Sequence, residues 1–148
     1  INCDLGETPG HQENDQDNAL LDLVSSANIA CGFHAGDAQR MEATVRAAAQ
    51  RGVAIGAHPG LDDKANFGRI PRAISPRETY QLLLYQIGAL YGFTRAAGAT
   101  MHHVKLHGAL YHMVSQDGDL SLAVIQAIQD FDRDVPAKAA ASNKVVKP

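Results

Sequence analysis

Short apolar segments alternate with longer amphipathic ones along this chain, and the alternation limits its fold more than any other feature. We expect strands near Ile1–Leu5, Ala27–Gly32, Val53–Ala57 and His103–Leu106. The stretches between them carry apolar residues at helical spacing. Strands that alternate with helices build β/α units, whose strands lie parallel in one sheet. The sequence therefore predicts an α/β fold with a mainly parallel sheet.

The strongest helix signal follows Ser75. Ser75 is a favourable N-cap, Pro76 suits the first helical turn, and Glu78 can bond back to the N-cap backbone. Apolar residues then recur at helical spacing until Gly98, which is a typical helix terminator. We therefore predict a long amphipathic helix between Ser75 and Gly98.

Two further helices and one loop are predicted, and another helix is expected to begin near Tyr111 and His112. Asp37 can cap a helix that Gly52 ends, and a last helix is expected over Leu120–Phe131. The segment Pro59–Pro71 is rich in Gly, Pro, Asp and Asn, which favours a loop. Loops of this length often carry function.

Length and composition indicate one domain. The 148 residues are 45% hydrophobic, enough for a single core. We expect β/α units over 1–131 and a weakly ordered or truncated tail over 132–148. The net charge of −3 disfavours binding to nucleic acid. No apolar run approaches the roughly 20 residues that span a bilayer, so the sequence is interpreted as that of a cytoplasmic protein.

The two cysteines lack the paired spacing of a zinc site or a disulfide framework. Cys3 and Cys31 fall in separate apolar segments, and free cysteine is among the most buried residue types. We predict reduced core cysteines, and a catalytic thiol is the alternative.

Titratable side chains gather at the ends of the predicted strands. The carboxyl ends of parallel strands face the same way, so these side chains should converge. Taken singly, each has an ordinary explanation as a helix cap, a turn residue or a strand-end charge. Their recurrence at four strand ends favours a shared site. The residues are Asp4, Glu7, His34, Asp37, His58, Lys105 and His107.

These residue types suit amide hydrolysis. A carboxylate or imidazole can take a proton from water, and Lys105 can neutralise an oxyanion on a carbonyl. Alternatively, Asp4, His34 and His58 could bind a divalent cation.

Other polar residues have weaker signals. Arg69 could pair with a substrate carboxylate or be a solvated loop residue, and Tyr111 could simply pack. His11, His102 and His103 belong to no recognisable constellation and are expected to be surface or core histidines. The sequence has no glycine-rich phosphate loop, which predicts that any nucleotide is bound elsewhere.

Six motifs, taken in order and spacing, resemble the LamB/YcsF-like family over roughly residues 1–130. They are NCDLGE (2–7), ANIACGFHAGD (27–37), GAHPG (56–60), FGR (67–69), YQIGAL (85–90) and KLHGALY (105–111). The resemblance implies one component of an enzyme that, with separate B and C subunits, converts 5-oxoproline to L-glutamate while ATP is hydrolysed. It also implies that ATP is bound with those partners.

The resemblance further implies site residues and a fold. The catalytic residues would be Asp4, Glu7, His34, His58, Lys105 and His107, and Arg69 would bind the substrate carboxylate. We also predict that Asp37 and Tyr111 bind substrate. The implied fold is an irregular β/α barrel similar to polysaccharide deacetylases. A barrel of this kind needs about 200–250 residues. We therefore expect it to be incomplete here, with an exposed sheet edge that would favour self-association.

Two other functions fit the same residues. One is a metal-dependent amidohydrolase or deacetylase that acts alone through Asp4, His34 and His58. The other is a non-catalytic subunit that binds a small carboxylate and presents it to another protein.

Overall fold

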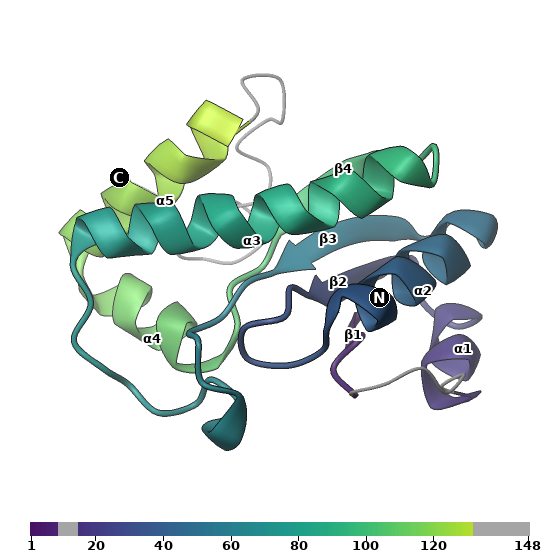
Figure 1. Cartoon of the computed structure of the whole chain (residues 1–148), viewed down its shortest axis with the longest axis horizontal. Coiled ribbons are helices and arrows are strands. Elements are labelled where there is room, and N and C mark those ends of the chain that lie inside the picture. Colours follow the sequence, from purple (N-terminus) through teal and green to yellow (C-terminus); the bar gives the residue numbers. More distant parts are fainter. Residues whose placement is uncertain (9–14, 132–148) are drawn as a thin grey trace.

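The structure, a computed structural model, describes residues 1–8 and 15–131 and contains one parallel sheet (Figure 1). Its strands are β1 (Asn2–Leu5), β2 (Ser26–Ala30), β3 (Ala54–His58) and β4 (Met101–Val104), in the spatial order β1-β2-β3-β4. Each pairs in parallel with its neighbour. The predicted parallel α/β fold is confirmed. These four strands do not by themselves close into a barrel, and β1 and β4 are the edges of their sheet.

Helices connect the strands and follow the last one. They are α1 (Asp15–Leu21), α2 (Ala38–Gln50), the short 3₁₀ helix η1 (Lys64–Asn66), α3 (Pro76–Ala96), α4 (Gly108–Gln116) and α5 (Gly118–Phe131). The predictions for α2, α3 and α5 are confirmed. The short α1 was not predicted, because seven residues with few apolar positions give little periodic signal.

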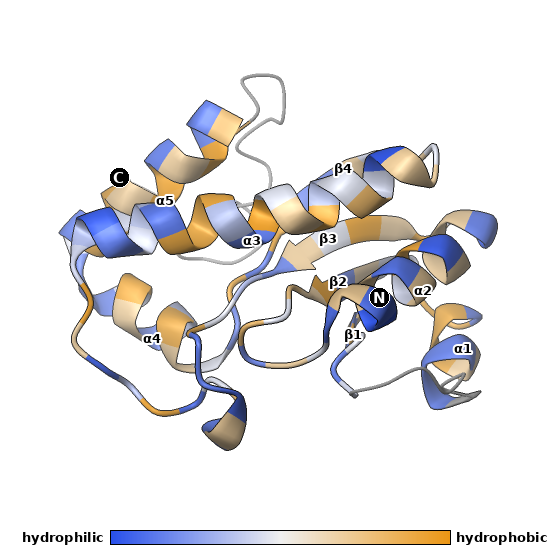
Figure 2. Ribbon diagram, viewed as in Figure 1, coloured by the Kyte–Doolittle hydropathy of each residue, from blue (hydrophilic) through white to orange (hydrophobic). Residues whose placement is uncertain are grey.

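The helix α3 begins as its sequence predicts. The Oγ of Ser75 accepts a hydrogen bond from the Glu78 backbone N–H, and the Glu78 carboxylate accepts one from the Ser75 N–H. Leu83, Ile87 and Leu90 on its inner face are fully buried. Along its length α3 contacts α2, α5, β3 and β4 (Figure 1). Figure 2 shows apolar and hydrophilic residues alternating around this helix, as expected for an element with one buried face.

The two faces of the sheet differ in character. Alternate strand residues form apolar rows in the hydrophobic core, namely Cys3, Ala27, Ile55 and Met101, then Leu5, Ile29, Ala57 and Val104. The opposite face carries a polar row made of Asp4, Asn28, Gly56 and His103. A Cβ at Gly56 would overlap the His103 imidazole, so glycine leaves room for that ring. One face of the sheet thus packs in the hydrophobic core, and the opposite face presents polar side chains.

Both cysteines are free, as predicted, with Cys31 buried and Cys3 half-buried. Burial raises the pKa of the Cys31 thiol to about 12, so this sulfur stays protonated and packs as a core group. The predicted tail 132–148 and His11 lie outside the described residues. Among the helices that are described, none is long and apolar enough to cross a membrane.

Candidate active site at the carboxyl ends of the strands

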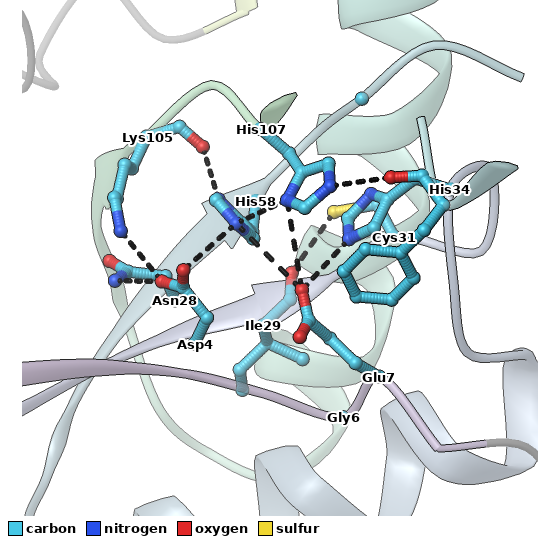
Figure 3. Close-up of polar contacts among 12 residues, drawn as sticks. Asp4, Gly6, Glu7, Asn28, Ile29, Cys31, His34, His58, Lys105 and His107 are labelled. Carbon is cyan, nitrogen blue, oxygen red and sulfur yellow. Dashed lines mark hydrogen bonds and ion pairs between the residues drawn. The ribbon is translucent and has the colours of Figure 1, made fainter. Parts of the chain in front are cut away.

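Six side chains from the four strand ends meet at one edge of the sheet (Figure 3). They are Asp4, Glu7, His34, His58, Lys105 and His107. Asp4 lies in β1 and His58 ends β3, whereas Glu7 follows β1, His34 follows β2, and Lys105 and His107 follow β4. Their catalytic roles remain predictions, but the structure brings together the groups that the sequence placed at four separate strand ends.

Glu7 lies at the centre of three imidazoles (Figure 3). Its Oε1 is 3.1 Å from Nε2 of His34, 3.7 Å from Nδ1 of His107 and 4.0 Å from Nε2 of His58. The Glu7 side chain is 24% exposed, whereas the three histidines are buried. The side of the cluster that faces solvent is therefore the side of the Glu7 carboxylate.

Backbone carbonyls orient two of the imidazoles. Nδ1 of His58 is 2.7 Å from the Lys105 carbonyl oxygen, and Nε2 of His107 is 2.8 Å from the Phe67 carbonyl oxygen. Phe67 holds its carbonyl there with a left-handed backbone (φ 56°), a conformation that costs a non-glycine residue free energy and often occurs at functional sites. The remaining ring nitrogens, Nε2 of His58 and Nδ1 of His107, are 3.0 Å apart.

His34 lies flat against His107. Their ring centroids are 3.7 Å apart and their planes differ by 6°, while the Phe67 ring meets both edge-on. Burial lowers the pKa of His34, and burial together with the neighbouring His34 lowers the pKa of His107 to about 4. Both imidazoles are therefore uncharged at neutral pH and can accept a proton or bind a cation.

Asp4 is held in its ionised form. Its Oδ1 accepts hydrogen bonds from Lys105 Nζ at 2.7 Å and from Asn28 Nδ2 at 2.8 Å, and its Oδ2 lies 3.4 Å from His58 Nε2. Burial alone would raise the pKa of Asp4, but the neighbouring His58 and the hydrogen bond from Lys105 outweigh it and hold this pKa well below its usual range. Such a carboxylate is a weak base, and it is well suited to orient an ammonium group.

Sequence reasoning missed two residues of this polar network. Asn28 donates to both Asp4 and Asn2, and its Oδ1 lies 2.7 Å from Nε2 of His103. Asn28 was hidden inside an apolar strand, and His103 was expected to be an isolated surface or core histidine. The signal that could have found them is the period-two alternation that puts both on the face of Asp4.

Gln86, a fully buried residue of α3, was also missed. Its Nε2 donates to the Gly60 carbonyl at 2.9 Å, and its Oε1 accepts from the Gly60 N–H at 3.0 Å. Gly60 lies against the cluster, because a Cβ there would come within 2.8 Å of Nδ1 of His34. Gln86 thus fixes the backbone on which the His34 ring rests.

The three residues predicted to bind substrate occupy different settings. The exposed Arg69 places its guanidinium 5.0 Å from the centroid of the Phe67 ring, next to the cluster. Asp37 caps α2 by accepting from the Arg40 N–H at 2.8 Å, as its ordinary explanation predicted. Tyr111 is half-buried in α4. Substrate binding by these residues remains a prediction.

The residues able to hold a metal ion differ from the predicted set. Glu7, His34, His58 and His107 offer ligand atoms that all lie within 4.8 Å of one another. The carboxylate of this group is Glu7 rather than the predicted Asp4, which binds Lys105 instead.

A parallel sheet with carboxylates, imidazoles and an amine at its carboxyl edge defines an α/β protein with its polar site at the strand ends. More particularly, the chain belongs to the LamB/YcsF family, which it matches over residues 1–148.

Curated relatives support this membership. The chain is 52% identical over 146 residues to a Bacillus licheniformis protein named as the A subunit of 5-oxoprolinase, covering 99% of this chain and 58% of that protein. It is also 52% identical over 147 residues to the protein of the same name from Bacillus subtilis, covering 99% of this chain and 57% of that protein. The chain therefore spans little more than half the length of these relatives.

A solved structure has the same fold. It is a lactam utilization protein from Thermus thermophilus, which aligns with a TM-score of 0.83 and 42% sequence identity. The alignment covers 95% of this chain and 62% of that protein.

Proposed function

We propose that this protein acts as the A subunit of an ATP-dependent 5-oxoprolinase, which opens the lactam ring of 5-oxoproline to give L-glutamate together with B and C subunits. The observation that carries the proposal is the 52% identity to proteins named as 5-oxoprolinase A subunits over nearly the whole chain. The strand-end cluster supports it, because its groups suit the hydrolysis of an amide.

Each clustered side chain has a proposed role in the hydrolysis of the lactam. Water adds to the lactam carbonyl carbon, the ring C–N bond breaks, and the nitrogen leaves with a proton. The imidazoles and Glu7 are the groups that can take the proton from water. Lys105 would stabilise the negative charge that develops on the carbonyl oxygen, held in place by the ionised Asp4. Arg69 would pair with the substrate carboxylate.

The proposal assigns ATP to the partner subunits. A five-membered lactam is a stable amide, so activation by phosphate would make its ring easier to open. The sequence contains no glycine-rich phosphate loop that would hold a nucleotide. The relatives' name, which makes each of them one subunit of an enzyme, is consistent with such a division of labour.

We also propose that the four strands form one side of an irregular β/α barrel. Neighbours in the sheet are consecutive in the chain, as in a barrel of β/α units, and β1 and β4 are its edges. The aligned region covers only 58% and 57% of the two curated relatives. Further β/α units of the same kind would pair with these edges and enclose the polar face.

Reconstitution tests the proposal. The full-length protein is mixed with its candidate B and C subunits, 5-oxoproline, Mg²⁺ and ATP, and glutamate release is followed as each component is omitted in turn. We expect glutamate only in the complete mixture. Glutamate released by the isolated protein without ATP would instead identify an amidohydrolase that acts alone. Substrate binding without turnover in an assembled complex would identify a carrier.

A further inference from the structure

The hydrogen bonds at the outer side of the cluster fix where two imidazole hydrogens lie. A backbone carbonyl only accepts, so Nδ1 of His58 must carry the hydrogen that points to the Lys105 oxygen. For the same reason Nε2 of His107 carries the hydrogen that points to the Phe67 oxygen. In an uncharged ring the other nitrogen then presents a lone pair. Both lone pairs face the inside of the cluster.

Inside the cluster these lone pairs have no hydrogen between them. Nε2 of His58 and Nδ1 of His107 are 3.0 Å apart, and Oε1 of Glu7 lies 4.0 Å and 3.7 Å from them. A carboxylate also only accepts. Oδ2 of Asp4 lies 3.4 Å from Nε2 of His58 and is a fourth acceptor. Acceptors that converge in a largely buried space are unfavourable unless a positive charge lies among them. Histidines that bind metals are oriented in this way, with the second ring nitrogen donating to a carbonyl.

We propose that Glu7, His58 and His107 bind one divalent transition-metal ion of the zinc class. Such an ion binds imidazole nitrogen and carboxylate oxygen at about 2.0–2.2 Å, which puts neighbouring ligand atoms roughly 3–3.5 Å apart. The three observed separations of 3.0, 3.7 and 4.0 Å need only small side-chain movements to reach this spacing. The rings of His58 and His107 stand at 89° to each other, so both can point at one ion.

His34 has a different role in this arrangement. A metal ion lies close to the plane of the imidazole that binds it, and the His34 and His107 rings are parallel and stacked at 3.7 Å. One ion therefore cannot lie in both planes. Nε2 of His34 instead donates to Oε1 of Glu7 at 3.1 Å, which orients the carboxylate ligand. Its buried Nδ1, which has no partner among the described residues, is then an acceptor, the less costly group to leave unpaired.

Three protein ligands leave a coordination position open, as in catalytic rather than structural zinc sites. The Glu7 side chain is the partly exposed member of the set, so the open position faces the solvent side of the cluster. The ion would occupy the site of the proposed 5-oxoprolinase activity. When bound, it would take up the lone pairs of His58 and His107 and would itself activate the water in their place. Metal binding is measured without substrate, ATP or partner subunits. The metal-site proposal can therefore fail while the proposed 5-oxoprolinase activity stands, and the reverse.

The test is metal binding by the full-length protein after treatment with a chelator. Zn²⁺ binding is followed by titration calorimetry, and Co²⁺ is added as a coloured probe of coordination. We expect one ion per chain, and loss of binding in Glu7→Gln, His58→Gln and His107→Gln. His34→Gln should bind about 10–100-fold more weakly, as for other residues that orient a ligand. Asp4→Asn should retain binding, which separates this set from one that contains Asp4.

His102→Gln is the matched control, because His102 is exposed on β4 and contributes no ligand to the cluster. Unchanged binding in the His107 variant, or equal loss in the His102 variant, would overturn the proposal.

The alternative to a metal ion is an extra proton on His58, shared with His107 and balanced by the charges of Asp4 and Glu7. Nitrogen NMR shifts of the metal-free wild-type protein at pH 7.5 show whether His58 carries one proton or two, and this measurement needs no variant. A doubly protonated His58 that persists when Zn²⁺ is added would also rule out the metal site.

Discussion

Lys105 donates a 2.7 Å hydrogen bond from its Nζ to Oδ1 of Asp4, although the two residues belong to opposite edges of the sheet. Asp4 lies in β1, and Lys105 follows β4. Strands are spaced about 4.8 Å apart, so the outer strands of a flat four-stranded sheet would be roughly 14 Å apart. The contact therefore indicates that the polar face is concave where the strands end. This concavity brings side chains 101 residues apart in the sequence into one site.

The Asp4–Lys105 pair predicts a specific loss of activity. In the reconstituted mixture of the proposed 5-oxoprolinase, Lys105→Met should lower kcat about 10²–10³-fold, because it removes the ammonium proposed to stabilise the developing oxyanion. Methionine keeps most of the apolar stem, so the melting temperature should change little. The control is Arg46→Met, which removes an exposed positive charge on α2 that pairs only with Glu42 in the described part of the chain. Equal kcat values for Lys105→Met and the wild-type protein would remove Lys105 from the proposed mechanism.

Gln86 predicts a loss of stability. Gln86→Leu preserves side-chain size but leaves the Gly60 N–H and carbonyl without the partners they have in the folded protein. Each unpaired buried group costs about 1–3 kcal/mol, so the free energy of unfolding should fall by at least about 2 kcal/mol. Gln81→Leu, on the exposed face of the same helix, should change it by less than about 0.5 kcal/mol. Chemical denaturation of both variants gives the comparison, and similar losses would contradict a specific role for Gln86.

The sequence predicted the strands, the strand-end residues and α3 because these depend on local patterns. Apolar runs that end in Asp4, His58 or Lys105, and the capping box at Ser75, can be read within a few residues. The roles of Asn28 and His103 depend instead on register across three strands. A shift of one residue in either outer strand would turn its side chain to the other face and separate the pair, so their contact could not be deduced from either strand alone.

The proposed metal-binding set shows the same limit of sequence-based prediction. Asp4 and Glu7 are both carboxylates at the end of one strand, and the sequence offers no means of deciding which lies among all three imidazoles. The choice depends on Lys105, which reaches across the sheet and binds Asp4. It also depends on the left-handed Phe67, whose carbonyl oxygen orients His107. These are tertiary relationships with no local signal.

His103 predicts a pH dependence of stability. Burial, followed by the nearby His102 and Lys105, lowers its pKa from the ordinary value of about 6.5. Below that pH the unfolded chain binds a proton that the folded protein takes up less readily, so this group's contribution to stability is lost as the pH falls. The melting temperature should thus decrease less between pH 7.5 and pH 5.5 in His103→Gln than in the wild-type protein. His112→Gln, at an exposed position on α4, should leave the decrease unchanged. A decrease as large in His103→Gln as in the wild-type protein would contradict the assignment.

Gly56 predicts a destabilisation that depends on one neighbour. In Gly56→Ala the new Cβ would overlap the His103 ring, which would have to leave Asn28. Overpacking of this kind costs about 1–3 kcal/mol of unfolding free energy.

Gly88→Ala is the control for Gly56→Ala, because Gly88 is exposed in α3 and a Cβ there meets no atom within 4 Å. It should stabilise the protein by about 0.5–1 kcal/mol through the higher helix propensity of alanine. The decisive measurement is the double mutant with His103→Ala, in which alanine at position 56 should cost much less than in the wild-type background. If the two costs are equal, the penalty does not come from the His103 ring, and glycine is required there for the strand backbone instead.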